Sequence, residues 1–186
     1  MDEHRGGGLH GELRKKMLPP EAVLENMGVA EGDTLLEIGA GTGYFAIPAA
    51  RFVGERGRVI ASDISERSLE ELKSRIPPSN SNIRVLLGEE GGVDLPPASA
   101  DKILMAFVLH EIEDKKAYLL EAKRLLKPGG ELTVVEWDTV DSPMGPAVSE
   151  RIALTEALRL AREAGFHATR YSKLNDFHYI CTLKAE

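Results

Sequence analysis

Acidic residues accompany a glycine-rich loop near the start of the chain, and together they could bind a nucleotide-like ligand. Glu37 lies in the apolar segment 34–38, and the loop after it has glycines at Gly39, Gly41 and Gly43. Glycine between a strand and a helix lets backbone N–H groups approach a ligand without obstruction by side chains, although it also suits a plain tight turn. Burying a carboxylate without a partner is costly. Glu37 therefore either bonds loop amides or solvent, or it meets a cation or polar donor of the ligand.

A second acid, Asp63, follows the apolar segment 58–62. A carboxylate at such a strand end can accept both hydroxyls of a ribose, although it could also favour the start of a helix near Ser65. The fingerprint of NAD-binding loops is G-x-G-x-x-G, whereas this loop reads G-x-G-x-G, with Tyr44 in the place of the third glycine. Glu37 would repel the pyrophosphate of NAD but attract the ammonium and sulfonium of S-adenosylmethionine. The pattern therefore favours S-adenosylmethionine over NAD.

Candidate catalytic residues follow two later apolar segments. His110 comes after segment 102–107, at the sheet edge where ligands bind in open α/β folds. An imidazole with a pKa near 6.5 suits the acceptance of a proton, but His110 could equally cap the next helix or pack against the ligand. Its neighbour Glu111 could assist or be a solvated acid. Glu136 and Asp138 could point into an acceptor pocket or form an exposed strand end.

Short apolar strands alternate with helices along the chain, which predicts a parallel sheet covered on both faces. A polar turn at 175–176 predicts a closing β-hairpin. A helix from Pro19 and Pro20 should end at Gly28, and Pro128-Gly129-Gly130 should stop a later helix. The expected strands are 34–38, 58–62, 83–87, 102–107, 131–137, 168–174 and 177–184, and the main helices between them are about 44–53, 65–76, 115–126 and a last one that ends at Gly165.

Composition narrows the class of protein. With 186 residues, 42% of them hydrophobic, the chain fits one domain over 1–186, in which 1–18 form a flexible arm or lid and 19–186 the core. A net charge of -7 argues against a nucleic-acid partner. Cys181 is the only cysteine and is expected in the core, and neither a membrane span nor a signal segment is expected, so the predicted location is the cytoplasm. Metal-ligand spacings such as C-x-x-C are absent, and no metal is expected.

Several motifs in one order resemble the class I S-adenosylmethionine-dependent methyltransferases over roughly residues 20–185. Glu37-Ile38-Gly39-Ala40-Gly41-Thr42-Gly43-Tyr44-Phe45 is similar to their first motif, and Ala61-Ser62-Asp63-Ile64-Ser65 to their second strand end. The segments 88–96, 100–112 and 125–132 resemble three further motifs. Within the class, the likeness is to the branch that contains ubiquinone/menaquinone C-methyltransferases.

The resemblance implies a Rossmann-like α/β/α sandwich with a seven-stranded sheet of order 3-2-1-4-5-7-6 and one antiparallel strand. Its cofactor would be S-adenosylmethionine. Glu37 and the loop Gly39–Gly43, with Tyr44, would hold the methionine part, and Asp63 the ribose. The remaining cofactor contacts would be Ile64 on the adenine, Gly88, Glu89 and Glu90 near the adenine amine, and Ala106 and Phe107 beneath the methyl group. Which of the two neighbouring glutamates meets the adenine is left open.

The main hypothesis is a methyltransferase for a small-molecule acceptor, with His110 and Glu111 as candidate catalytic residues. One alternative is a module that binds the cofactor only to stabilise a partner. Another is an NAD-dependent oxidoreductase, which the glycine spacing and the lack of a Tyr-x-x-x-Lys pair disfavour. Residues 1–18 and the loop 138–150 are expected to roof the acceptor site. The acceptor, the methylated atom and the oligomeric state are left open.

Overall fold

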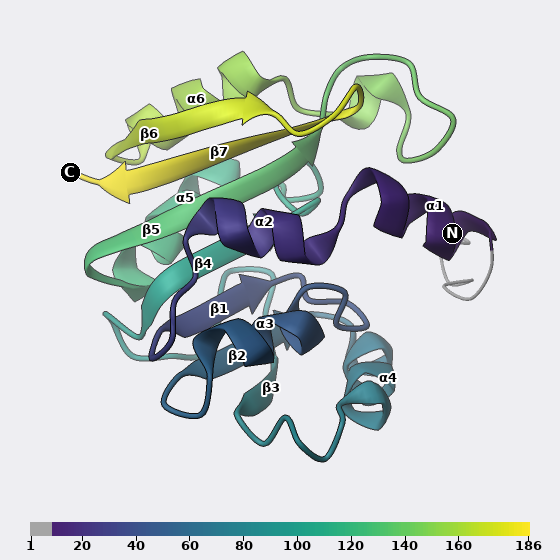
Figure 1. The fold of residues 1–186 in the computed structure, drawn as a ribbon. Helices are drawn as coiled ribbons and strands as arrows, with labels where there is room; N and C mark the ends of the chain where they lie inside the picture. The colour runs from purple at the N-terminus through teal and green to yellow at the C-terminus, as the bar shows by residue number, and fades with distance from the viewer. Residues whose placement is uncertain (1–8) are drawn as a thin grey trace.

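A seven-stranded sheet lies between two layers of helices (Figure 1). The computed structural model describes residues 9–186. The strands are β1 (Thr34–Ile38), β2 (Arg58–Asp63), β3 (Ile83–Leu87), β4 (Ala100–Ala106), β5 (Leu126–Trp137), β6 (Phe166–Lys173) and β7 (His178–Ala185). The helices are α1 (Leu9–Met17), α2 (Pro20–Met27), α3 (Ala46–Val53), α4 (Glu66–Arg75), α5 (Lys115–Leu125) and α6 (Leu154–Glu163), with a short 3₁₀ helix at Val148–Glu150.

The strand order is β3-β2-β1-β4-β5-β7-β6, which confirms the predicted topology. β1 pairs in parallel with both β2 and β4, whereas β7 is antiparallel to both of its neighbours. The chain runs outward from β1 to β3 and then crosses to β4 on the other side of β1. Ligands of open α/β sheets bind at such a reversal, outside the carboxyl ends of the strands. The fold therefore places the ends of β1 and β4 at the expected binding edge.

Each face of the sheet has its own apolar core. Helices α2, α3 and α4 cover one face, and α5 and α6 cover the other (Figure 1). Along β1 the side chains alternate between the two, so Leu35 packs with α2 and α3 while Leu36 and Ile38 pack with α5 and α6. By the same alternation Glu37 faces the side of Leu35, beneath the start of α3.

Local sequence signals set several element ends as predicted. α2 begins at Pro20 and ends at Gly28, whose left-handed backbone (φ 64°) lets its N–H cap the Glu25 carbonyl. The side chain of Ser65 caps α4 by accepting a hydrogen bond from the Ser68 N–H. Cys181 lies in the core, and burial raises the pKa of its thiol to about 12, as expected for an inert packing residue.

Several element boundaries differ from the prediction, and two of these differences have a clear cause. α3 begins at Ala46, two residues later than expected, because the turn that follows β1 continues through Phe45. Helix α5 ends at Leu125 before it reaches Pro128, and β5 begins at once, at Leu126, which pairs with Ala100. The Pro-Gly-Gly segment lies inside β5, where the register with β4 shifts. It therefore forms an irregularity within a strand and does not stop the helix.

Residues 9–18 of the predicted arm form α1 and its exit. Leu18 is buried in the core on the α2 side, so the end of the arm is anchored. Residues 1–8, which include the roof candidates His4 and Arg5, lie outside the described residues. The role of the arm as a lid stays a prediction.

Candidate functional site

The glycine loop after β1 is held tightly against two neighbouring segments. The N–H groups of Gly39 and Ala40 both donate to the Ser62 carbonyl, at 2.8 and 2.9 Å. Gly39 has a φ of 75°, and a Cβ there would lie 2.2 Å from Cγ2 of Val108. Only glycine combines this backbone with so close an approach. The loop is therefore shaped by the packing of β1 against β2 and the segment after β4.

Asp63, at the end of β2, fastens the same loop. Its Oδ2 accepts a hydrogen bond from the Gly41 N–H at 2.7 Å, and its Oδ1 accepts one from the Ser65 N–H at 2.8 Å. A carboxylate has about four acceptor positions, so these two bonds leave capacity for a ligand. Asp63 thus positions the loop and presents a negative charge beside it.

Glu37 is a carboxyl group in an unusual environment. The residue is 2% exposed, and its Oε2 has no hydrogen-bond partner among the residues described. Burial raises the pKa of this carboxyl to about 8, against the opposing effects of a hydrogen bond from the Ala46 backbone and the charge of Arg14. Near pH 7 the side chain is mostly protonated. A cation placed beside it would favour the ionised form.

A cavity of about 760 Å³ opens at the carboxyl ends of β1 to β4 and along the start of α5. Ile64 at its wall is 63% exposed, which leaves an apolar surface available for a flat ligand. The lining residues are Ile38, Gly39, Ser62, Asp63, Ile64, Gly88, Glu89, Glu90, Gly91, Val108, Glu111, Ile112, Glu113, Asp114, Ala117 and Tyr118.

The structure brings about half of the predicted site residues into this cavity. Those that line it are Gly39, Asp63, Ile64, Gly88, Glu89, Glu90 and Glu111. Those that do not are Glu37, Ala40, Gly41, Gly43, Tyr44, Ala106, Phe107 and His110. The first set comprises the residues expected around the nucleoside together with Gly39 and Glu111. The second contains most of those expected around the methionine part, so the cavity corresponds to the nucleoside half of the site.

Helix α1 packs over Tyr44 and Phe107, two predicted site residues that do not line the cavity. The Arg14 guanidinium lies 4.1 Å from the centre of the Tyr44 ring and 5.8 Å from that of Phe107. The Tyr44 hydroxyl donates to the Leu18 carbonyl at 2.6 Å. From its sequence, Arg14 is one of three consecutive basic residues on a solvated helix face. The structure shows instead that it stacks on aromatic rings at the loop.

His110 and Glu136 form a close pair at the ends of β4 and β5. His110 Nδ1 lies 2.8 and 3.0 Å from the two carboxylate oxygens, and the His110 N–H donates to Oε1 at 3.1 Å. The side chains are 8% and 0% exposed. Burial lowers the pKa of the imidazole, but the hydrogen bond and the charge of Glu136 outweigh it, and the pKa is raised above 6.5.

An aromatic cluster adjoins this pair and contains a buried histidine. Its place beside the predicted turn at 175–176 suggests a surface or hairpin position for His178, yet the residue is 3% exposed and its ring lies 4.2 Å from Trp137 and 5.2 Å from Phe107. Burial lowers its pKa to about 4, helped by the charges of Arg14 and Arg151. This imidazole is neutral at pH 7. The hydrophobic periodicity of β7 was the only signal that could have placed it inside.

The predicted roof loop 138–150 is organised by Arg151. Its guanidinium donates to the carbonyls of Asp138 and Val140 at 3.1 and 2.7 Å, and to that of Pro146 at 2.8 Å. It also lies 5.1 Å from the centre of the Trp137 ring. One arginine thus ties the loop to the aromatic cluster.

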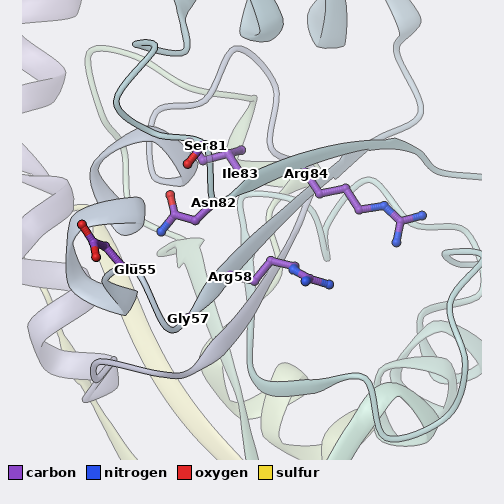
Figure 2. Close-up of a pocket in the computed structure, with 7 residues that line it drawn as sticks. All are labelled: Glu55, Gly57, Arg58, Ser81, Asn82, Ile83 and Arg84. Carbon is purple, nitrogen blue, oxygen red and sulfur yellow. The ribbon is translucent and has the colours of Figure 1, made fainter.

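A smaller cavity, of about 240 Å³, lies near the amino ends of β2 and β3 (Figure 2). Arg58 and Arg84 extend away from Glu55, and the amide of Asn82 already donates to the carbonyls of Ala50 and Gly54 at 2.9 Å. None of the predicted site residues lines it. The cavity at the carboxyl edge, which holds Asp63 and the glycine loop, is therefore the candidate site.

Comparison with known proteins places the chain in a family. The methyltransferase domain model matches residues 36–134. A ubiquinone/menaquinone biosynthesis C-methyltransferase of Teredinibacter turnerae is 32% identical over 74% of this chain and 53% of its own length. One from Vibrio cholerae is 28% identical over 94% and 77%. The chain spans about half the length of the first of these relatives.

Solved structures agree with this match. A SAM-dependent methyltransferase from Aquifex aeolicus superposes with a TM-score of 0.87 at 29% identity, over 91% of both chains. The sheet order, the glycine loop and the acidic strand ends define a class I methyltransferase. The chain belongs to the methyltransferase domain family, which confirms the predicted family and its cofactor, S-adenosylmethionine.

The fold by itself does not determine a reaction. The [4+2]-cyclase SpnF has a TM-score of 0.79 to this chain at 18% identity, over 98% of this chain and 85% of its own. The chemistry has to be argued from the residues of the site.

Proposed function

We propose that the protein transfers the methyl group of S-adenosylmethionine to a small-molecule acceptor. The observation that carries this proposal is the buried Glu37 carboxyl, whose Oε2 has no hydrogen-bond partner among the described residues and which lies beneath the glycine loop that Asp63 fastens. The ammonium of the methionine part would supply the missing partner. The ribose hydroxyls would take the remaining acceptor positions of Asp63.

The cavity suits the rest of such a cofactor. Adenine would pack on the exposed Ile64, with its amine toward Glu89 or Glu90. Ala106 ends β4 and Phe107 follows it, on the side of the methionine part. Phe107 has a φ of 60°, a strained backbone for a bulky residue, which directs its ring into the aromatic cluster. When bound, S-adenosylmethionine supplies an electrophilic methyl group on a sulfonium that is already a good leaving group. The protein would contribute mainly position and the exclusion of water.

The proposal also covers the domain organisation, the class of acceptor and the cellular location. We propose a single domain whose arm 1–18 covers the site, a small-molecule acceptor and no nucleic-acid partner, and a location in the cytoplasm. Within residues 9–186, no helix is long and apolar enough to cross a membrane. The net charge of -7 supports an acceptor other than nucleic acid.

Calorimetry with the full chain tests the proposal. S-Adenosylmethionine and its demethylated product are expected to bind at micromolar strength, with one ligand per chain. NADH, followed by its fluorescence, is expected not to bind, because the loop reads G-x-G-x-G and lacks the G-x-G-x-x-G spacing of NAD-binding loops. Undetectable binding of both methionine derivatives at high protein concentration would refute the proposed function. Enhanced NADH fluorescence would favour the oxidoreductase alternative.

A further inference from the structure

Among residues 9–186, three of the four hydrogen-bond contacts of the Glu136 carboxylate are with His110. Its two oxygens contact His110 Nδ1, Oε1 also accepts from the His110 N–H, and Oε2 lies 3.2 Å from the Trp137 N–H. An ionised carboxylate only accepts hydrogen bonds, so Nδ1 must carry a proton. In the neutral ring the lone pair is then on Nε2. The pair fixes both the orientation and the tautomer of the imidazole.

Nε2 lies on the side of the ligand cavity. It is 3.9 Å from Oε1 of Glu111, a residue that lines the cavity. A fully buried carboxylate is expensive to keep ionised. A lysine or arginine partner would offset that cost more simply than a histidine does. A histidine at this position adds a group that can exchange a proton with a ligand.

We propose that His110 and Glu136 form a proton-accepting pair that selects acceptors whose methylated atom must lose a proton, as in a hydroxyl or an acidic carbon. This proposal rests on the proposed function. The acceptor atom forms a bond to the methyl carbon, the carbon–sulfur bond breaks with its electron pair going to sulfur, and Nε2 takes the proton. The imidazolium later releases that proton to solvent. His110 is the catalytic residue, and Glu136 is a positioning residue that acts through it.

The charges around His110 give the proposal a pH signature. Glu136 on β5 and Glu111 after β4 stabilise the imidazolium, whereas Lys115 on α5 and burial oppose it, and the net effect raises the pKa above 6.5. The base form is present only above this pKa, so the rate should rise with pH to a midpoint above 6.5. In Glu136→Gln the stabilising charge is lost, and this midpoint should move to lower pH.

Transfer of radiolabel from S-adenosylmethionine to four probes tests the selection. The probes are 3,4-dihydroxybenzoate, 1,4-naphthohydroquinone, benzylamine and thiophenol. Label is expected in the first two with the wild type and not with His110→Gln, whereas the neutral amine and the thiolate already carry an available lone pair, so any label in them should not depend on His110. His110→Gln should lower kcat by about 100-fold or more, the range of general base catalysis, without changing the affinity for S-adenosylmethionine. Glu136→Gln should lower kcat by about 10-fold or more, and Glu136→Asp should recover part of the loss.

Two controls separate catalysis from folding. His167→Gln alters an exposed residue of β6 and should change neither the rate nor the pH profile. Nitrogen-15 NMR of the histidine rings should show His110 protonated at Nδ1, with a pKa that falls in Glu136→Gln. Label in the amine or thiol only, label in none of the probes, or a folded Glu136→Gln variant with an unmoved pH midpoint would overturn the inference. If the wild type does not bind S-adenosylmethionine, that result would instead refute the proposed function.

Discussion

Replacing Asp63 with alanine is expected to weaken the binding of S-adenosylmethionine by at least about 100-fold. Two hydrogen bonds from ribose hydroxyls to a carboxylate would be lost, at about 1.5–3 kcal/mol each. The glycine loop would also be held less firmly, because the Gly41 and Ser65 N–H groups lose their acceptors. Calorimetric titration of the variant with the demethylated product measures the loss without turnover.

Asp101→Ala is a matched control for this experiment. Asp101 also accepts a backbone hydrogen bond, from the Thr34 N–H at 2.8 Å, but it lies at the opposite end of β1, near Lys127. Replacing Asp101 should lower the free energy of unfolding and leave the affinity for the demethylated product unchanged. Equal affinities of the wild type and Asp63→Ala would show that Asp63 serves only to hold the loop.

Cofactor binding is also expected to release about one proton near pH 7, and this release should disappear in Glu37→Gln. The carboxyl, with a pKa of about 8, is mostly protonated before binding, and an ammonium beside it would stabilise the carboxylate. Calorimetry in phosphate and in Tris, which differ in ionisation heat, counts the protons released. The variant should bind about 10-fold more weakly, because a charge-assisted bond becomes a neutral one.

The same carboxyl should make the unliganded protein less stable as the pH rises. Its pKa is raised from 4.5 to about 8, so between these values the folded state holds a proton that the unfolded chain has released. The contribution of this carboxyl to the free energy of unfolding is highest below pH 4.5 and falls until about pH 8, by on the order of 5 kcal/mol. Denaturant titrations of Glu37→Gln should lack this decline, whereas Glu25→Gln, on the exposed face of α2, should retain it. An unchanged pH dependence in Glu37→Gln would contradict the account.

Most of the fold could be predicted from the sequence because short apolar segments and their turn residues specify a parallel sheet. Gly28 and Ser65 mark helix ends through local backbone and side-chain bonds, and the sequence carries both signals. The start of β5 could not be predicted, because the pairing of Leu126 with Ala100 decides it. That contact joins segments far apart in the chain and overrides the local preference of Pro128 for a break.

The same distinction between local signals and contacts between distant segments applies to the site residues. Asp63 and the glycine loop follow strands directly, so the rule for the carboxyl edge of a sheet brings them together. The His110–Glu136 contact depends on the parallel register of β4 and β5 and on the turn after β4, which residue types alone do not specify. The stacking of Arg14 on Tyr44 depends on where α1 packs, and the charge pattern of α1 indicated only a solvated face.

A crystal structure of the full chain with the demethylated product would show where each part of the cofactor binds. We expect the amino group beside Oε2 of Glu37, the ribose hydroxyls on Asp63, the adenine on Ile64, and the sulfur facing Phe107 and His110. A bound product that leaves Oε2 of Glu37 without a polar partner, and Asp63 in contact with Gly41 and Ser65 alone, would contradict this expectation.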